Sequence, residues 1–137
     1  SNGLSWAKTS DATVGVGADQ GMAATQWHLL RTGGIGQMIG MIHSTEHTCL
    51  CMRSMDDNQG TPIGLAMCDA TDQTQIWEAF ENPRNQAYWS QNNGRSGGLS
   101  LTQDANGSLI QRSYTLNDAN QLWTIRDNST GQPTTPF

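Results

Sequence analysis

The sequence predicts an all-β protein built from three copies of one strand–turn–strand unit. A Gln-x-Trp signature ends at Trp77 and again at Trp123, and a less regular copy ends at Trp27. The spacings of 50 and 46 residues lie in the range that marks repeated supersecondary units. Gly, Ser, Thr, Asn and Asp interrupt the chain about every 8 to 12 residues with β-type segments between them, which favours short strands over helices.

The three copies agree beyond the tryptophan. Each has a leucine on a β-type segment, Leu4, Leu50 or Leu99, which lies 23, 27 or 24 residues ahead of its tryptophan. An acidic or amide-rich turn follows the leucine segment, and a short apolar stretch follows the turn. Spacing, strand and turn recur together, which chance similarity does not explain. We therefore expect Trp27, Trp77 and Trp123 to be buried at equivalent positions in one shared core.

The pattern places eleven strands in a single domain of 137 residues, with repeats at about 1–33, 34–82 and 83–128. The second and third copies have a strand before the leucine strand, and the first copy begins without one. The polar, Pro-containing residues 129–137 predict a flexible tail. The expected strands are 4–8, 14–18, 25–31, 38–43, 49–54, 63–67, 75–80, 86–91, 99–103, 109–114 and 121–126.

Charge and hydropathy exclude several classes of function. The net charge is −5 with only 7 Lys and Arg residues, so the clustered cations that bind nucleic acid are absent from the sequence. Charged residues make up 14%, and a surface rich in Gly, Ser, Thr, Asn and Gln suits a neutral polar ligand. No stretch approaches the roughly 18 apolar residues of a membrane span, and no signal segment opens the chain. We expect a soluble protein that needs no cofactor.

Three cysteines, Cys49, Cys51 and Cys68, allow one disulfide and one free thiol. We expect Cys49 to bond Cys68, because this bridge would close a hairpin between the Leu50 strand and the strand at 63–67. Such a loop stabilises a fold by about 3 kcal/mol in the chain-entropy model. A disulfide implies an oxidising compartment and hence a secreted protein. The cysteine count alone leaves open three reduced cytosolic thiols.

Three Gln-x-Trp units of about 46 residues, with Cys-Leu opening one hairpin and a cysteine closing it, resemble the ricin-B type β-trefoil lectins. The resemblance covers nearly the whole chain and is especially close over residues 117–124. It implies a β-trefoil whose Gln-x-Trp tryptophans enter the core, and a hairpin disulfide with the spacing of Cys49 and Cys68. It also implies binding of galactose or N-acetylgalactosamine in shallow pockets, one per repeat, without catalysis.

A working pocket in that family has an aspartate two places after the Cys-Leu cysteine, an aromatic residue ending the next strand, and an Asn-Gln pair before the tryptophan. This sequence departs from the pattern, because the aspartate position holds Ser5, Cys51 and Ser100. Only the third copy keeps the amide pair, as Asn120 and Gln121. The aromatic position holds small residues near Gly17, Ala66 and Ser113.

A sugar pocket needs a carboxylate to accept hydroxyl hydrogen bonds and an apolar face to cover the ring. The third repeat is our first choice, with a carboxylate, a donor and a stacking face beside the amide pair. Most acidic residues of the second repeat are expected to form turns, and we expect one or two working pockets. The third-repeat candidates are Asp104, Arg112, Tyr114, Asn120 and Gln121; the second-repeat candidates are Asp56, Asp57, Asp69, Asp72 and Gln75; the first repeat offers Asp11, Asp19, Gln20 and Trp6.

Lectin trefoils of this kind often end a larger secreted protein, either a glycosidase or a toxin. The resemblance implies glycans of cell-surface glycoproteins or glycolipids as partners, with oligomerisation and membrane contact through the parent protein. Pore-forming hemolysin/cytolysins of Vibrio, which carry a trefoil after the pore-forming domain, resemble this arrangement. The alternatives are the carbohydrate-binding module of a secreted glycosidase and a non-catalytic trefoil used as a protein-interaction scaffold.

Residues 43–47 match the zinc-protease pattern H-x-x-E-H, and Cys49 and Cys51 follow as further ligands. The protease needs both histidines on one helix face, and Gly36 and Gly40 would each cost that helix about 1 kcal/mol. Thr45 and Thr48 favour strands. We therefore expect a turn between strands here. No Gly-x-Ser-x-Gly elbow occurs in the sequence, and adjacent aspartates in one turn would point apart, so we predict no enzyme and no metal site.

Overall fold

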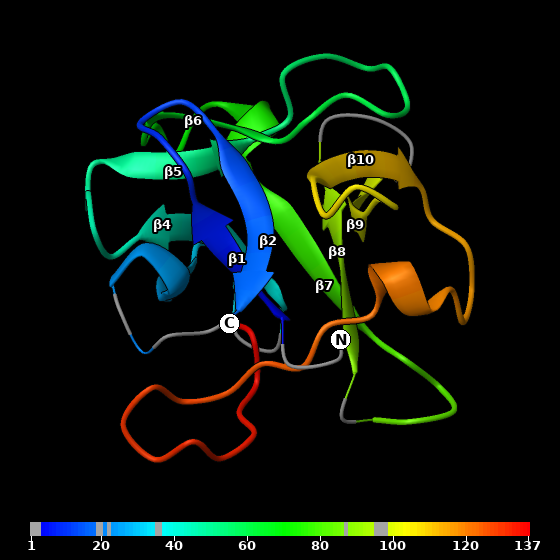
Figure 1. The fold of residues 1–137 in the computed structure, drawn as a ribbon. Coiled ribbons are helices and arrows are strands. Elements are labelled where there is room, and N and C mark those ends of the chain that lie inside the picture. The colour runs from blue at the N-terminus through cyan, green and yellow to red at the C-terminus, as the bar shows by residue number, and fades with distance from the viewer. Residues whose placement is uncertain (1–3, 19–20, 22, 35–36, 87, 95–98) are drawn as a thin grey trace.

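Three antiparallel hairpins, one from each repeat, are joined in a ring (Figure 1). The computed structural model describes residues 4–18, 21, 23–34, 37–86, 88–94 and 99–137. Single β-bridges connect the hairpins pairwise, from Thr13 to Gly64, from Pro62 to Ile110 and from Gly15 to Ser108. Each repeat therefore contacts both others, as the threefold repetition of the sequence requires. The hairpins are β1 (Leu4–Lys8) with β2 (Val14–Ala18), β5 (Leu50–Arg53) with β6 (Gly64–Met67), and β9 (Leu99–Gln103) with β10 (Leu109–Ser113).

The remaining strands join one repeat to the next. β3 pairs with β4 over five residues and β7 pairs with β8 over five residues. β4 also contacts β5, and β8 also contacts β9, so each of these two strands bridges two repeats. No helix in the described residues is long and apolar enough to cross a membrane. The elements are β3 (Trp27–Arg31), β4 (Ile39–Ser44), β7 (Trp77–Glu81), β8 (Trp89–Asn93) and the 3-10 turns η1 (Ala23–Thr25), η2 (Gln73–Gln75) and η3 (Ala119–Gln121).

The Gln-x-Trp tryptophans make the same hydrogen bond in every repeat. Each indole Nε1 donates to the carbonyl two residues after the repeat's leucine. The three bonds run from Trp27 to Trp6 O at 2.8 Å, from Trp77 to Met52 O at 3.2 Å and from Trp123 to Leu101 O at 3.1 Å. This equivalence fixes how the repeats superimpose. Trp6 occupies in the first repeat the place that Met52 and Leu101 hold in the others.

One core contains side chains from all three repeats. Trp77 and Trp123 are buried in it as expected, whereas Trp27 is only half-buried and packs at its edge. The expectation of three equally buried tryptophans is therefore wrong for the first repeat. Trp27 lines a cavity between the first and third repeats, which leaves its indole partly exposed. The core residues are Trp6, Val14, Ile42, Leu50, Met52, Ile63, Leu65, Trp77, Ala79, Trp89, Leu101, Leu109, Trp123 and Ile125.

The eleventh strand expected at 121–126 does not form. The segment makes only isolated bridges, from Trp123 to Trp89 and from Arg126 to Pro133. After Trp123 the chain instead bonds its own C-terminal residues, with Asp127 N donating to Gln132 O at 2.9 Å, and Pro133 has no N–H with which to extend a ladder. Residues 129–137, expected as a flexible tail, fold back: Thr134 N donates to Ile125 O at 2.9 Å. The ring of Phe137 packs over Gly40, where even a Cβ atom would collide with it.

The disulfide joins Cys51 to Cys68, so the expected Cys49–Cys68 bridge is wrong. Cys68 N donates to Cys49 O at 2.8 Å, which places these two residues opposite each other as expected. The side chain of Cys49 nevertheless lies exposed in the turn before β5, and its thiol is free. Cys51 is fully buried, with its Cα 5.1 Å from that of Cys68, within the normal range for a disulfide. The direction of the side chains, and not the pairing of the backbones, therefore determines which cysteine forms the disulfide with Cys68.

Candidate functional site

Gln121, expected as a sugar contact, is a buried structural residue. Only 1% of its surface is exposed. Its Oε1 accepts from Thr115 N at 2.8 Å, and its Nε2 donates to Ser113 O at 2.8 Å and to Thr102 Oγ1 at 3.2 Å. The amide thereby clamps the chain on both sides of Tyr114 against the Gln-x-Trp segment. Both N–H donors of the amide and one acceptor site of its oxygen serve the fold, so Gln121 positions the neighbouring residues.

Tyr114 and Asn120 lie on the segment between β10 and Trp123 that Gln121 holds. Tyr114 is 37% exposed, and Asn120 is exposed on η3 next to the clamp. A residue that the sequence reasoning missed, Asp118, caps η3 by accepting from Asn120 N at 3.0 Å. Asn117 adopts a left-handed conformation, and buried Asn82 donates to its Oδ1 at 3.0 Å. The turn after β10 thus presents an aromatic face, a carboxylate and an amide from a fixed backbone.

Asp104, expected to supply the carboxylate, lies at the other end of the hairpin. It sits in the turn between β9 and β10, and Leu99 pairs with Ser113 four residues further along the ladder. Asp104 is level with Ser108, six residues before Tyr114, and at about 3.3 Å per residue this separates Asp104 from Tyr114 by about 20 Å. Asp104 Oδ1 accepts from Asn106 N at 2.8 Å and from Ser108 N at 3.0 Å, so it shapes the turn. Arg112 is exposed on β10.

The second-repeat candidates divide between the two ends of their hairpin in the same way. Asp56 and Asp57 lie in the turn between β5 and β6. Asp56 Oδ1 accepts from Asn58 N and from Thr61 Oγ1, and buried Gln111 of the third repeat donates to the backbone carbonyl of Asp56 at 2.8 Å. Asp56 thus joins two repeats and forms a turn, as expected for most of this set.

Asp69, Asp72 and Gln75 lie together after β6. Gln75 repeats the clamp of the third repeat, with 2% of its surface exposed, accepting from Asp69 N and donating to Met67 O. The Thr71 hydroxyl and backbone N–H hold the pKa of Asp69 below its usual range. The Thr74 hydroxyl does the same for the pKa of Asp72, which caps η2. These carboxylates are bound to their own turn.

The first-repeat candidates form no comparable group. Asp11 pairs with Lys8 at 2.7 Å, and Lys8 also pairs with Glu46 at 2.8 Å. These partners raise the pKa of Lys8 above its usual value, Asp11 contributing most. Asp19 and Gln20 lie outside the described residues. Trp6 is 7% exposed and belongs to the core.

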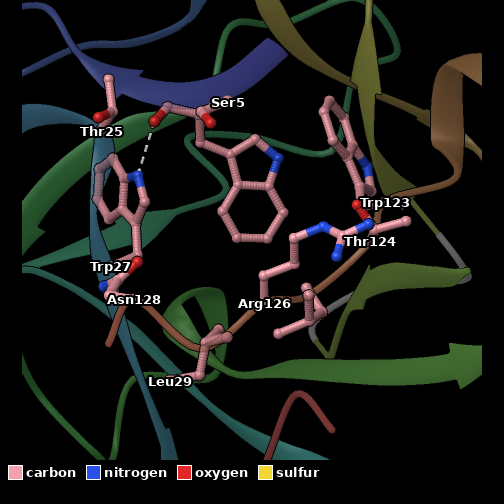
Figure 2. A pocket seen from close by; sticks show the side chains of 10 residues that line it. Ser5, Thr25, Trp27, Leu29, Trp123, Thr124, Arg126 and Asn128 are labelled. Atoms are coloured by element: carbon pink, nitrogen blue, oxygen red, sulfur yellow. Dashed lines mark hydrogen bonds between the residues drawn. The ribbon is translucent and has the colours of Figure 1, made fainter. Parts of the chain in front are cut away.

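A cavity of about 130 Å³ lies between the first and third repeats (Figure 2). Trp6 and Trp123 meet edge to face in its wall, with ring centroids 5.5 Å apart. Trp6 Nε1 is buried and has no hydrogen-bond partner among the described residues. Arg126 lies on the segment 123–128, which follows the third Gln-x-Trp signature, and its side chain extends toward Trp123 (Figure 2). The lining residues are Ser5, Trp6, Thr25, Trp27, Leu29, Trp123, Thr124, Ile125, Arg126 and Asn128.

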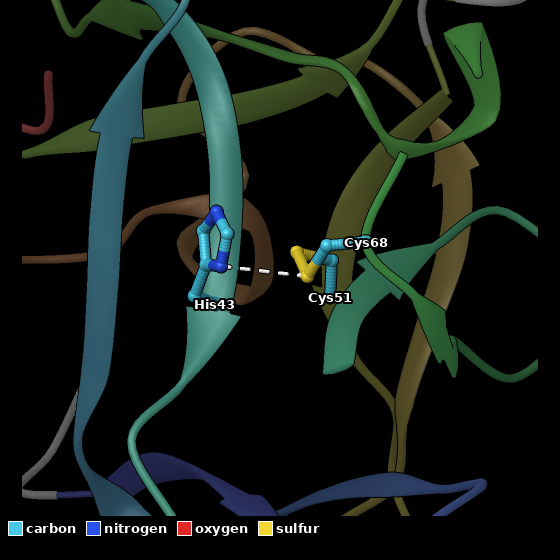
Figure 3. Close-up of side chains that lie close together, drawn as sticks. All are labelled: His43, Cys51 and Cys68. Atoms are coloured by element: carbon cyan, nitrogen blue, oxygen red, sulfur yellow. Dashed lines mark hydrogen bonds between the residues drawn. A yellow bond between two sulfur atoms is a disulfide. The ribbon is translucent and has the colours of Figure 1, made fainter. Parts of the chain in front are cut away.

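The H-x-x-E-H segment forms a strand end and a turn. His43 ends up beside the disulfide, with its Nδ1 3.4 Å from Cys68 Sγ (Figure 3). His43, Cys51 and Cys68 bring three potential metal ligands within 4.8 Å of one another. Because Cys51 and Cys68 are bonded to each other, they offer no thiolate, and thiolate is the form of cysteine that binds metal. The arrangement is a disulfide packed against an imidazole.

Comparison with known proteins decides the family. The model of the ricin-type β-trefoil lectin domain matches residues 38–134. The chain belongs to this family. None of the curated proteins compared with this chain matches it. A ricin-type trefoil is a carbohydrate-binding fold, and the chain is therefore a carbohydrate-binding module in general terms.

Two solved structures support the trefoil. A designed threefold-symmetric protein, ThreeFoil, is 18% identical with a TM-score of 0.68, covering 85% of this chain and 83% of its own. A mosquitocidal holotoxin is 14% identical with a TM-score of 0.74. That match covers 90% of this chain and 16% of the holotoxin chain. At these identities the likeness establishes the fold alone.

Proposed function

We propose that this domain recognises terminal galactose or N-acetylgalactosamine at the turn that follows β10. The observation that carries the proposal is that Tyr114, Asp118 and Asn120 share one turn held by a buried clamp. An aromatic face covers a sugar ring, a carboxylate accepts hydroxyl hydrogen bonds, and an amide donates and accepts. A single shallow site of this kind binds with a dissociation constant near the millimolar scale, about −4 kcal/mol.

Weak binding by one site suits a targeting role in which many copies act together. Multivalency raises avidity by orders of magnitude without new contacts. The likeness to a region of a mosquitocidal holotoxin supports a toxin as parent. The domain would then direct a larger secreted protein, such as a pore-forming hemolysin/cytolysin of the Vibrio kind, to cell-surface glycoproteins or glycolipids. Oligomerisation of the parent would supply the multivalency.

The test measures binding of separate variants to a galactosyl surface after their folding is checked. Tyr114→Ala and Asp118→Asn should each lower affinity about tenfold, since each removes a stacking face or a charge-assisted hydrogen bond worth roughly 1.4 kcal/mol. Asn120→Ala should weaken binding similarly. Asp104→Asn is the matched control, because it alters a carboxylate of the same hairpin about 20 Å away and should bind like the parent. Unchanged binding by the first three variants would place the galactose site elsewhere.

A further inference from the structure

We propose that His43, Cys51 and Cys68 form a zinc site when the disulfide between the two cysteines is reduced. The site lies where β4, β5 and the residue after β6 meet (Figure 3). It is separate from the turn after β10 and does not depend on the galactose proposal. One ring nitrogen of His43 and the two cysteine sulfurs lie within 4.8 Å of one another.

The pairing of the strands brings the three side chains together. His43 on β4 pairs directly with Cys51 on β5, and directly opposed residues of neighbouring strands extend to the same face of a sheet. Cys51 pairs in turn with Ala66 on β6, two residues before Cys68. Residues two apart along a strand share a face, so Cys68 extends to the side of Cys51 and His43. The register of three strands therefore fixes the cluster.

The geometry already matches a tetrahedral metal at one edge of the cluster. His43 Nδ1 lies 3.4 Å from Cys68 Sγ (Figure 3). Zinc binds histidine nitrogen at about 2.0 Å and cysteine sulfur at about 2.3 Å, so a tetrahedral angle separates these two ligand atoms by about 3.5 Å. The two sulfurs need a separation of about 3.8 Å, which they reach by side-chain rotation once their bond is broken.

The imidazole of His43 is poorly satisfied by the fold. Its Nε2 is buried and has no hydrogen-bond partner among the described residues. Its Nδ1 lies 3.3 Å from Thr48 O, a long contact, and faces the sulfur of Cys68. Buried polar groups normally have good hydrogen-bond partners, so an imidazole in this state requires an explanation. Zinc would give Nδ1 the strong partner that the fold does not supply.

The chemistry of the donor atoms selects the metal. Two thiolates and a neutral imidazole suit zinc, whereas magnesium and calcium require oxygen ligands. Two thiolates also balance the double charge of the ion, which suits the fully buried Cys51 beside Met41 and Ile76. His43 and Cys68 are half-buried, so water can take the fourth position of the metal.

Reduction of the disulfide by a dithiol generates the site. Two electrons and two protons pass to the sulfurs of Cys51 and Cys68, and the dithiol becomes a cyclic disulfide. Zinc then displaces both thiol protons and binds the two thiolates. The disulfide joins β5 to the residue after β6, whereas the ion would also join β4 through His43. Zinc would therefore hold the second repeat together in a compartment that reduces disulfides.

The experiment uses the full chain with Cys49→Ser, which removes the free thiol and leaves the disulfide intact. A water-soluble phosphine reduces the disulfide and becomes the phosphine oxide; unlike a dithiol, it binds zinc only weakly. Competition with a fluorescent chelator measures zinc affinity, and circular dichroism follows folding in the same samples. The reduced protein should bind zinc one to one and release about two protons, and the oxidised protein should not bind it.

Two histidine variants test the ligand set in this Cys49→Ser protein. His43→Ala should weaken zinc binding at least about tenfold, because it removes one of three protein ligands. His28→Ala is the matched control, because His28 pairs with His43 from β3, on the side of β4 away from Cys51. The ring centroids of the two histidines are 6.0 Å apart. Zinc binding by His28→Ala should be unchanged, and both variants can fold with the disulfide intact before it is reduced.

The proposal is overturned if the oxidised protein binds zinc as well as the reduced protein, or if the reduced protein does not bind it. Parent-like binding by His43→Ala, or equal losses in the two histidine variants, would also overturn it. If reduction unfolds the domain, zinc should restore the circular dichroism spectrum. A reduced chain that stays unfolded at saturating zinc contradicts the site.

Discussion

Replacing Gln121 by alanine should destabilise the domain far more than replacing its first-repeat counterpart, Gln26. Gln121 is 1% exposed and makes three side-chain hydrogen bonds at 2.8, 2.8 and 3.2 Å. A hydrogen bond contributes about 1 kcal/mol net, so Gln121→Ala should lower the free energy of unfolding by about 3 kcal/mol. Gln26 is half-buried, and among the described residues its amide donates to Gly21 O at 3.3 Å in an exposed setting, while Gln20, which matches Thr115 in the repeat, lies outside them. The loss of the Gln26 amide should cost below about 1 kcal/mol.

Urea unfolding with the disulfide intact measures both values. With an m-value of about 2 kcal/mol/M, the midpoint should fall by about 1.5 M for Gln121→Ala and by less than about 0.5 M for Gln26→Ala. Gln75→Ala should resemble Gln121→Ala, because Gln75 makes the same backbone clamp. Equal losses for Gln26 and Gln121 would refute the reasoning that burial and bond number set the value of this motif.

Two further predictions concern the second repeat. Cys49 should react with a maleimide in the native protein, because its thiol is free and exposed. Cys49→Ser should leave the free energy of unfolding unchanged, whereas Cys51→Ser should lower it by about 3 kcal/mol, as expected for a disulfide across a 17-residue separation. A Cys49–Cys68 bridge found by peptide mass spectrometry would contradict these expectations. Hydrogen bonds from Thr74 hold the pKa of Asp72 below its usual value of 3.8, so their stabilisation is present above about pH 4 and is lost as the pH falls through the folded-state pKa. The stability difference between the parent and Asp72→Asn should therefore shrink in acid, and a difference independent of pH between 7 and about 2 would contradict this.

The repeat structure could be predicted because it is written in local patterns. Leucine, turn and Gln-x-Trp recur at fixed spacing, and the equivalent bonds from Trp27, Trp77 and Trp123 confirm that spacing reports spatial equivalence. The all-β class followed from the same repeats, and the trefoil followed from the family resemblance that these repeats carry. Tyr114 and Asn120 both adjoin Gln121 or its hydrogen-bond partners, and their role as sugar contacts stays a prediction.

The errors arose where sequence proximity does not determine distance or direction. Asp104 is ten residues from Tyr114 in sequence, and the five-residue strand between them separates them by about 20 Å. Asp118 was present in the stretch that most resembled the family pattern, and its capping role depends on a turn that only the structure shows. The disulfide depended on whether the side chain of Cys49 or that of Cys51 points toward Cys68. Because β5 begins at Leu50, Cys51 lies in the strand and Cys49 lies in the turn before it.

The first repeat departs from the other two in sequence and in packing. Where Asp72 and Asp118 cap the equivalent 3-10 turns, its sequence has Met22, which carries no carboxylate. Its closing tryptophan is half-buried, and its core position holds Trp6 in place of Met52 and Leu101. The family model begins its match at residue 38 and so matches the second and third repeats. The repeat that lies outside this match is thus also the one whose packing differs from the shared pattern.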